Sequence, residues 1–124
     1  MHCTYLTRLQ HIKILENTYM RMYNYHMGKF EWDENKNRIN IEKHAADFVD
    51  AIQIFEKPLL VFQDSRKEYS EKRYICVGHV NGRIMIVIYT ERPKNIIRII
   101  SFRRANKREQ KKFRAEFKNK LEAH

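Results

Sequence analysis

Residues 73–90 read RYICVGHVNGRIMIVIYT, and this stretch decides the fold. Two runs of alternating apolar residues, 73–80 and 83–90, flank the dipeptide Asn81-Gly82. Asn-Gly readily supplies the positive φ angles of a type I′ turn, which matches the twist of two antiparallel strands. The stretch therefore predicts a β-hairpin with its turn at Asn81-Gly82.

Two further apolar runs extend this hairpin. Residues 59–62 follow Pro58 and are typical of a short buried strand, and residues 96–104 return after a turn that contains Pro93. Consecutive strands joined by short turns pair with their neighbours in the sheet. We therefore expect a four-stranded antiparallel meander.

The segment before the meander predicts a short strand and a helix. Residues 29–32 are typical of a strand, and Asp33 can cap a helix over residues 34–44. This helix has few apolar residues, so Ile39 and Ile41 would be its main anchors. We expect it to lie on the surface with one edge packed.

Two more helices follow from cap signals and apolar spacing. Asp47 can cap a helix that Pro58 ends, and its apolar residues recur at i, i+3, i+4 and i+7: Phe48, Ala51, Ile52 and Phe55. Near the end of the chain, Asn106 and Glu109 are spaced as a capping box ahead of a basic helix. The predicted class is α+β: a short N-terminal strand, two helices, a four-stranded antiparallel meander sheet and a C-terminal basic helix.

Residues 1–27 differ from the rest of the chain and allow two interpretations. Apolar residues at spacings of three and four predict an amphipathic helix: Tyr5, Leu9, Ile12, Leu15, Tyr19 and Met22. Alternatively, Met27 is the true start, and the preceding residues are a non-native extension. In both cases we expect residues 28–124 to form one domain, since 124 residues supply one modest core.

Positive charge is concentrated near the C-terminal end. Residues 103–120 contain nine Lys and Arg against two Glu, which gives +7 of the chain's net +10. Fixed cations gain free energy by releasing the counterions condensed on a phosphate backbone. A polyanion is therefore the expected partner, and the basic helix would hold it through Lys107, Arg108, Lys111 and Lys112. A merely solvated helix face is the alternative.

Several other classes of function lack support in the sequence. Cys3 and Cys76 do not form a metal motif or a convincing disulfide framework, and no nucleotide-binding or metalloprotease motif is present. We expect no metal and no cofactor. The apolar runs are too short for a signal peptide or a membrane span, so we expect a cytoplasmic protein that does not associate with membranes.

Four arginines begin, interrupt or end strands of the predicted sheet: Arg73, Arg98, Arg103 and Arg104. Phosphate chemistry without a metal needs fixed cations at the scissile phosphate, and a guanidinium keeps its charge. Strict alternation along residues 96–104 would put Arg98 and Arg104 on one face and Arg103 on the other. Charge that protects a sheet edge from aggregation is the alternative for each.

Candidates for proton transfer are weaker. His44 ends the first predicted helix, where the negative helix terminus favours the protonated imidazole and would suit a general acid. A capping histidine is at least as good an explanation. Tyr89, Glu91 and Glu71 lie near strand ends and could exchange protons if they face the arginines.

Residues 28–113 resemble the BrnT family of type II toxins, relatives of the RelE-like ribonucleases. The resemblance depends on motifs in a fixed order: Phe30-Glu31-Trp32-Asp33, Asn40 with Lys43-His44, Arg73-Tyr74 with Val77-Gly78, Val87-Ile88-Tyr89-Thr90-Glu91-Arg92, and Arg98-Ile99-Ile100-Ser101-Phe102-Arg103-Arg104-Ala105. It implies a RelE-like fold, a twisted antiparallel sheet with helices on one side. Members often have glycine where this chain has Ala45.

The resemblance also implies an activity and partners. The activity would be metal-independent endoribonuclease cleavage, in which the ribose 2′-hydroxyl attacks the adjacent phosphate. Arg103 and Arg73 would stabilise the phosphate first, then Arg98 and Arg104, with His44, Tyr89 and Glu91 as proton-transfer candidates. An acidic, partly disordered BrnA-like antitoxin with a ribbon-helix-helix DNA-binding part would silence the toxin, in a possible heterotetramer.

Two other functions remain open at this point. The chain could be a non-catalytic nucleic-acid-binding module, in which the basic helix holds RNA or DNA and no bond breaks. It could also be a degenerate toxin that only binds an antitoxin. Cleavage of RNA by purified protein would separate the endoribonuclease function from both of these alternatives.

Overall fold

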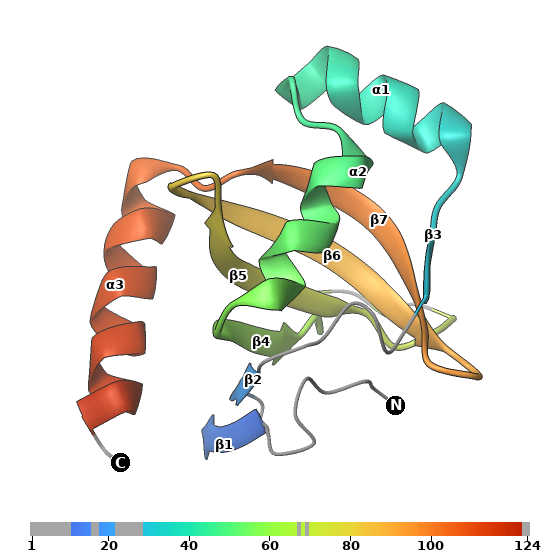
Figure 1. The fold of residues 1–124 in the computed structure, drawn as a ribbon. Helices are drawn as coiled ribbons and strands as arrows, with labels where there is room; N and C mark the ends of the chain where they lie inside the picture. The colour runs from blue at the N-terminus through green and yellow to red at the C-terminus, as the bar shows by residue number, and fades with distance from the viewer. Residues whose placement is uncertain (1–10, 16–17, 22–28, 67, 69, 123–124) are drawn as a thin grey trace.

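The computed structural model describes residues 11–15, 18–21, 29–66, 68 and 70–122. Within them the elements are β1 (His11–Leu15), β2 (Thr18–Arg21), β3 (Lys29–Glu31), α1 (Glu34–His44), α2 (Phe48–Ala51), a 3-10 helix (Ile52–Glu56), β4 (Leu59–Gln63), β5 (Tyr74–Val80), β6 (Arg83–Arg92), β7 (Ile96–Arg104) and α3 (Lys107–Glu122). The described strands form one sheet in the order β1-β2-β4-β5-β6-β7-β3 (Figure 1). The α+β class and the predicted order of elements from residue 29 onwards are confirmed.

The meander is present as the hairpin pattern predicted. Strands β4, β5, β6 and β7 pair with their sequence neighbours, and every pair is antiparallel. Asn81 and Gly82 have φ angles of 52° and 77°, the left-handed values that a type I′ turn requires. Strand β3 adds to the free edge of β7 in a parallel pair.

The helix expected within the N-terminal segment is wrong where the structure describes it. Residues 11–15 and 18–21 are strands that pair with each other, and β2 pairs with β4. An unpaired edge of β4 offers a row of backbone donors and acceptors, and such an edge is a template for a further strand. Backbone pairing therefore wins over the helical apolar spacing, while the other residues of that prediction lie outside the described ones.

Helix α1 is anchored by amides instead of the expected isoleucines. Ile39 and Ile41 are 55% and 40% exposed, whereas Asn37 and Asn40 are buried. Asn40 Nδ2 donates to the carbonyl oxygens of Ala46 (2.9 Å) and Phe102 (2.7 Å), and its Oδ1 accepts from the Phe102 N–H. Helix α1 thus docks on β7 through hydrogen bonds that an apolar-periodicity argument does not detect.

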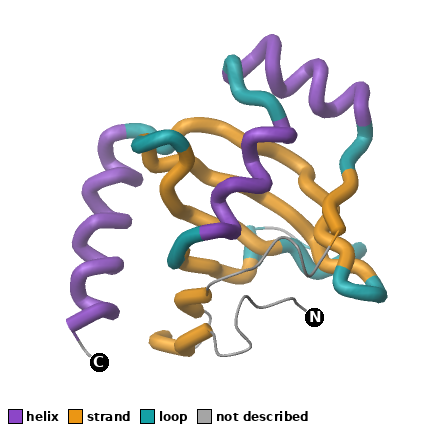
Figure 2. The backbone as a smooth tube through the Cα atoms, viewed as in Figure 1, coloured by secondary structure: helices purple, strands orange, loops and turns teal. Residues whose placement is uncertain are grey.

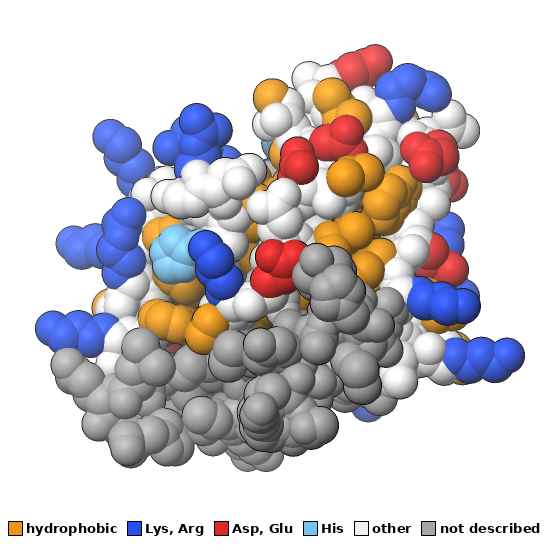
Figure 3. Space-filling model, viewed as in Figure 1, with side chains coloured by type: hydrophobic (Ala, Val, Ile, Leu, Met, Phe, Trp, Pro, Cys, Tyr) orange, Lys and Arg blue, Asp and Glu red, His pale blue; other side chains and the backbone are white. Residues whose placement is uncertain are grey.

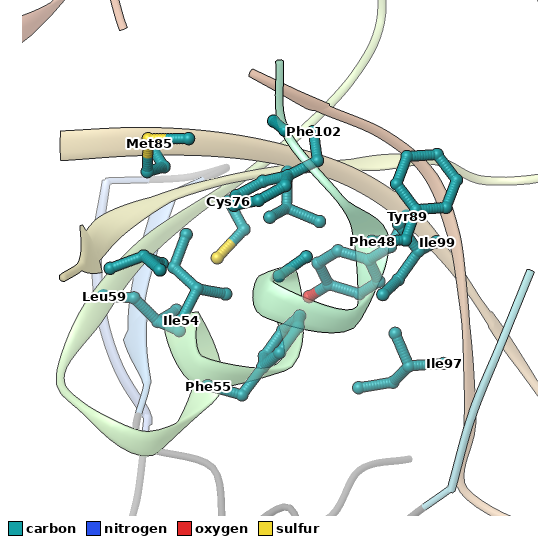
Figure 4. Packing of buried hydrophobic residues seen from close by; sticks show 14 of the residues in the cluster. Phe48, Ile54, Phe55, Leu59, Cys76, Met85, Tyr89, Ile97, Ile99 and Phe102 are labelled. Atoms are coloured by element: carbon teal, nitrogen blue, oxygen red, sulfur yellow. The ribbon is translucent and has the colours of Figure 1, made fainter. Parts of the chain in front are cut away.

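One face of the sheet is covered by α1, α2 and the 3-10 helix, and we call it the α1–α2 face. Asp47 caps α2 through the N–H of Val49, as predicted. Figure 4 shows that Phe48, Ile54 and Phe55 of this segment pack with Tyr89 and Phe102 from the sheet. This cluster is the main core.

Helix α3 lies on the opposite face, which we call the α3 face. Phe113 joins a second cluster with Leu60, Val77 and Ile86, and Phe117 packs at its edge. The expectation of helices on one side is therefore incomplete, because the chain places a helix on each face. Figure 2 shows α3 apart from α2, beside the end of the sheet at which β7 finishes.

A β-bulge in β7 changes which residues share a face. Tyr89 pairs with Ile99, but its neighbour Ile88 pairs with Ser101, so Ile100 is an extra residue in β7. Ile97, Ile99 and Phe102 consequently all reach the main core, although strict alternation would exclude Phe102. The same shift puts Arg98 and Arg103 on the α3 face and turns Arg104 away, which corrects the predicted pairing of Arg98 with Arg104.

Candidate functional site

A row of polar residues crosses the sheet on the α3 face. Glu31 of β3 pairs with Arg98 of β7, and Arg98 pairs with Thr90 of β6. Arg73 stands next to Thr90, since it precedes the paired residues Tyr74 and Tyr89. Asp64 completes the row, because its N–H donates to the Arg73 carbonyl oxygen at 2.7 Å. Two arginines therefore flank a threonine hydroxyl on adjacent strands.

Carboxylates orient the arginines of this row. Arg98 Nη1 donates to Glu31 Oε2 at 2.8 Å, and Arg92 Nε lies 3.3 Å from the same oxygen. Arg73 Nε lies 3.6 Å from Glu71 Oε2. Thr90 Oγ1 donates to the Lys72 carbonyl oxygen at 2.7 Å, which ties β6 to the loop before β5. The row is held by several independent contacts.

Arg103 is held on the same face by the first turn of α3. Its two terminal nitrogens donate to the two carboxylate oxygens of Glu109, each at 2.9 Å. Glu109 also accepts from the Asn106 N–H at 2.9 Å, and Asn106 Oδ1 accepts from the Glu109 N–H at 2.8 Å, so the predicted capping box is confirmed. One carboxylate thus caps the helix and orients an arginine.

The electrostatics follow from this pairing. The hydrogen bond from Arg103 holds the pKa of the Glu109 carboxyl below its usual value, and the same bond raises the pKa of Arg103. Arg66 acts in the opposite direction on the pKa of Arg103, since its positive charge lies near. Arg66, in the loop after β4, therefore acts electrostatically on an arginine that is distant from it in the sequence.

Arg66 is positioned by a buried aspartate. The Asp64 side chain is fully buried, and its oxygens accept from Arg66 Nε and Nη2, both at 2.8 Å, and from the Arg66 N–H at 3.2 Å. The Arg66 side chain itself is 63% exposed. This loop arginine thus has a fixed orientation at the surface.

The structure does not bring the remaining candidates to this face. Tyr89 is fully buried in the main core, where its ring stacks on Tyr74 with centroids 5.5 Å apart. Glu91 lies two residues after Tyr89 in β6 and therefore shares the α1–α2 face with it. His44 is exposed at the end of α1, and Arg104 is exposed at the end of β7 on the side of Phe102. Tyr89 is therefore a core residue, and the other three point away from the arginine row.

The basic residues of α3 are exposed, as their sequence pattern indicated: Lys107, Arg108, Lys111 and Lys112. Figure 3 shows Lys and Arg side chains gathered around this helix, at the left of the view. Lys112 also borders the groove between α3 and the sheet. The helix adds positive charge beside the α3 face.

Sequence reasoning missed Arg66, Asp64 and the pairing role of Glu109. An aspartate directly after a strand with an arginine two residues on is a usable local signal for Asp64 and Arg66. The Glu109 contact depends on β7 and α3 meeting at a turn.

In the described part of the chain, no three His, Cys, Asp or Glu side chains form a group that could hold a metal ion. None of the helices described there could span a bilayer.

The arrangement suits binding of phosphate groups. Arg98 and Arg103 each present a guanidinium that hydrogen bonds to a carboxylate orient, and Arg73 forms a longer ion pair with Glu71 at 3.6 Å. Such planar forks match phosphate oxygens. Arg98 and Arg103 are separated by the equivalent of four β6 residues, or roughly 13 Å at about 3.3 Å per residue. The face can therefore contact an extended polyanion at more than one point.

Comparison with known proteins identifies the family. Residues 32–109 match the family model described as the ribonuclease toxin BrnT of type II toxin-antitoxin systems. The crystal structure of the Brucella abortus ribonuclease toxin BrnT is similar at 32% sequence identity, with a TM-score of 0.53 over 64% of this chain and 99% of that one. No curated protein matches significantly. The chain belongs to the BrnT family of type II toxin-antitoxin ribonuclease toxins.

Proposed function

We propose that this protein is an endoribonuclease toxin that cleaves RNA without a metal ion, with the arginines of the α3 face stabilising the phosphate. Family membership supports RNA as the substrate. The observation that carries the proposal is the row in which Arg73 and Arg98 flank Thr90 on adjacent strands. Arg103 lies further along the same face and would hold a second phosphate of the strand.

The proposed reaction is a transesterification at phosphorus. The ribose 2′-oxygen attacks the adjacent phosphorus, the bond from phosphorus to the 5′-oxygen breaks, and a 2′,3′-cyclic phosphate and a 5′-hydroxyl result. Negative charge builds on the non-bridging oxygens, and donors already in place at those oxygens lower the barrier. Arg73 and Arg98 would supply these donors, because Glu71 and Glu31 already orient their side chains.

The reaction also moves two protons. One leaves the 2′-hydroxyl and one arrives at the 5′-oxygen. Glu71 is our candidate to accept the first, because it lies 3.6 Å from Arg73 at the end of the row. We assign no transfer to His44, Tyr89 or Glu91, since none of them shares the face of the arginines. Much of the rate would come from orientation and charge stabilisation.

The proposal includes the partner and the place of action. An antitoxin of the BrnA type, acidic and partly disordered before binding, would cover the cationic surface and carry the ribbon-helix-helix part that binds DNA. Two toxin and two antitoxin chains would form the complex. The toxin would act in the cytoplasm, where its RNA substrates are.

The test is cleavage of end-labelled RNA by purified protein in EDTA, with mapping of the product ends. We expect cyclic-phosphate ends from wild-type protein and no cleavage when the ribose at the cut site is 2′-O-methylated. Arg98→Ala should lose cleavage, whereas Arg104→Ala, at the end of β7 on the opposite face, should keep it. A requirement for added divalent ion would overturn the mechanism.

The same assay separates the alternatives left open by the sequence. RNA binding without cleavage would support a non-catalytic binding module. The non-catalytic module would also be supported if wild-type protein breaks no bond and Arg98→Ala only weakens the salt-dependent binding of RNA. Protein inert towards RNA that still binds an antitoxin would indicate a degenerate toxin.

A further inference from the structure

A groove of about 240 Å³ lies between α3 and the sheet. Its floor is apolar and comes from three strands: Leu60, Phe62, Ile75, Val77 and Ile86. Phe113 of α3 forms the wall, and Glu109, Lys112 and Glu116 form the rim. The mechanism proposed above does not use this groove.

The side chains that line the groove suit the binding of a flat aromatic ring. Phe62 from the sheet and Phe113 from α3 line it, and Phe62 is only partly buried. Aromatic side chains in cationic grooves are stacking surfaces for unpaired bases, and stacking tolerates any base. Its volume lies below the roughly 300–1,000 Å³ of pockets for drug-sized ligands, which suits a single ring system.

Cations adjoin one end of the groove. Glu109 of the rim holds Arg103 through two hydrogen bonds of 2.9 Å. Arg66 lies in the loop after β4, the strand that supplies Leu60 and Phe62 to the groove floor, and the buried Asp64 side chain orients its 63% exposed side chain. Its positive charge acts to lower the pKa of Arg103. Bringing two like charges together is unfavourable unless each is tethered, and an anion between them relieves the repulsion. The phosphate that joins a base in the groove to the next nucleotide would meet this pair.

We propose that the groove binds one unstacked RNA base and that Arg66 and Arg103 hold its adjoining phosphate, which makes Phe62, Glu116 and Arg66 specificity and positioning residues. This inference rests on the proposed function, because it assumes an RNA substrate. The rim carboxylate of Glu116 would accept a hydrogen bond from the exocyclic amine of a base, since Glu109 already accepts from Arg103 and Asn106.

An acidic protein segment fits the groove less well. The rim carries two carboxylates against one lysine, so acidic residues that flank an apolar protein segment would meet like charge at the opening. An RNA strand instead places its negative charge at the backbone, beside the two arginines, and its neutral base in the groove. Charge complementarity therefore favours RNA as the occupant.

The test is a double-mutant cycle that combines a substitution in the protein with removal of one base from the RNA, and it measures binding affinity. A short 2′-O-methylated oligonucleotide, which cannot be cleaved, is compared with versions that carry one abasic nucleotide at each position in turn, by fluorescence anisotropy. We expect one position at which base removal weakens binding to wild-type protein about tenfold. In Phe62→Leu, removal of the same base should have almost no further effect.

Two more variants and one control sharpen the test. Arg66→Ala should weaken binding of the intact oligonucleotide several-fold, Arg66→Lys should restore part of it, and Glu116→Gln should change the preference among the four bases at the sensitive position. Phe30→Leu, a half-buried phenylalanine on the α1–α2 face, should bind as wild type.

The possible failures are distinct. If wild-type protein cleaves RNA but the abasic penalty is the same in Phe62→Leu, the groove does not hold a base and the proposed function stands. If Phe62→Leu loses only antitoxin binding, the groove belongs to a protein partner and this inference is wrong. If wild-type protein neither binds nor cleaves RNA, both proposals fail.

Discussion

Arg98 and Arg103 lie on the same face of the sheet although their positions in β7 differ by five. An odd separation would place them on opposite faces in a regular strand. The extra residue Ile100, between the pairs Tyr89 with Ile99 and Ile88 with Ser101, restores the shared orientation. A bulge that redirects side chains is common beside functional sites. The shared orientation of Arg98 and Arg103 depends on that single residue.

The geometry of Arg73 and Arg98 predicts that lysine cannot replace either of them in RNA cleavage. Arg73→Lys and Arg98→Lys keep the positive charge but lose the planar fork, so we expect cleavage to fall by about 100-fold in each. The measurement is single-turnover cleavage of a labelled oligonucleotide. Arg83→Lys, at an exposed position beside the hairpin turn, is the matched control and should cleave at the wild-type rate. Equal losses in all three would show a general effect of replacing arginine with lysine, and no special role for the guanidinium fork of Arg73 or Arg98.

Glu109→Gln should bind RNA more tightly and fold less stably. The substitution removes the carboxylate that occupies Arg103 and weakens the capping box, and exposed pairs and caps of this kind contribute roughly 0.5–1 kcal/mol. Affinity for a 2′-O-methylated oligonucleotide and the free energy of urea unfolding measure the two effects. Weaker binding by this variant would mean that Glu109 positions Arg103 for RNA and does not compete with it.

Asn40→Leu should destabilise the fold by about 3 kcal/mol, because it leaves the N–H of Phe102 and the carbonyl oxygens of Ala46 and Phe102 without their buried partner. Urea unfolding monitored by circular dichroism measures the change. Ile39→Ala on the exposed side of the same helix is the control, with an expected loss below about 0.5 kcal/mol. A small effect of Asn40→Leu would contradict the hydrogen-bonded docking of α1.

Ala45→Gly should stabilise the protein by about 1 kcal/mol. Ala45 follows α1 with a φ of 54°, a left-handed conformation in which the Cβ atom is strained and glycine is not. Thermal unfolding of the two proteins measures the difference. A lower melting temperature for Ala45→Gly would show that unfolded-state entropy outweighs the relief of strain.

Stability should fall as the pH drops below 6.5, and His79 should account for part of the fall. Burial, with Lys57 and Arg114 nearby, lowers the pKa of His79 below 6.5, and its ring packs on Phe113 of α3 with centroids 5.5 Å apart. The unfolded chain therefore takes up the proton at higher pH than the folded one. The stabilisation is complete above 6.5 and is lost as the pH falls through the lower folded value.

His79→Leu keeps an apolar contact with Phe113 and removes the titration. Urea unfolding between about pH 7.5 and 5, above the range in which most carboxylates titrate, should therefore give a flatter stability profile for the variant. An unchanged slope would assign the pH dependence to other groups.

From residue 29 onwards the sequence determined the elements, because local signals carry them. Asn81-Gly82 fixed the hairpin, Asp33, Asp47 and Asn106 fixed the helix starts, and alternating apolar runs fixed the strands. Each of these signals acts within a few residues, so it survives without knowledge of the fold. The family motifs likewise lie in the linear order of the chain, and they supplied the class of activity.

The tertiary structure alone decided which of these residues meet. Strict alternation could not locate the bulge at Ile100, because a one-residue slip in pairing depends on the neighbouring strand. Tyr89 and Arg98 were both candidate site residues in the sequence, yet one fills the core and the other faces outward. The charge of Arg66 acts on Arg103 only in the folded chain, where β4 and α3 line one groove. Contacts between residues distant in sequence depend on packing free energy, which no local pattern records.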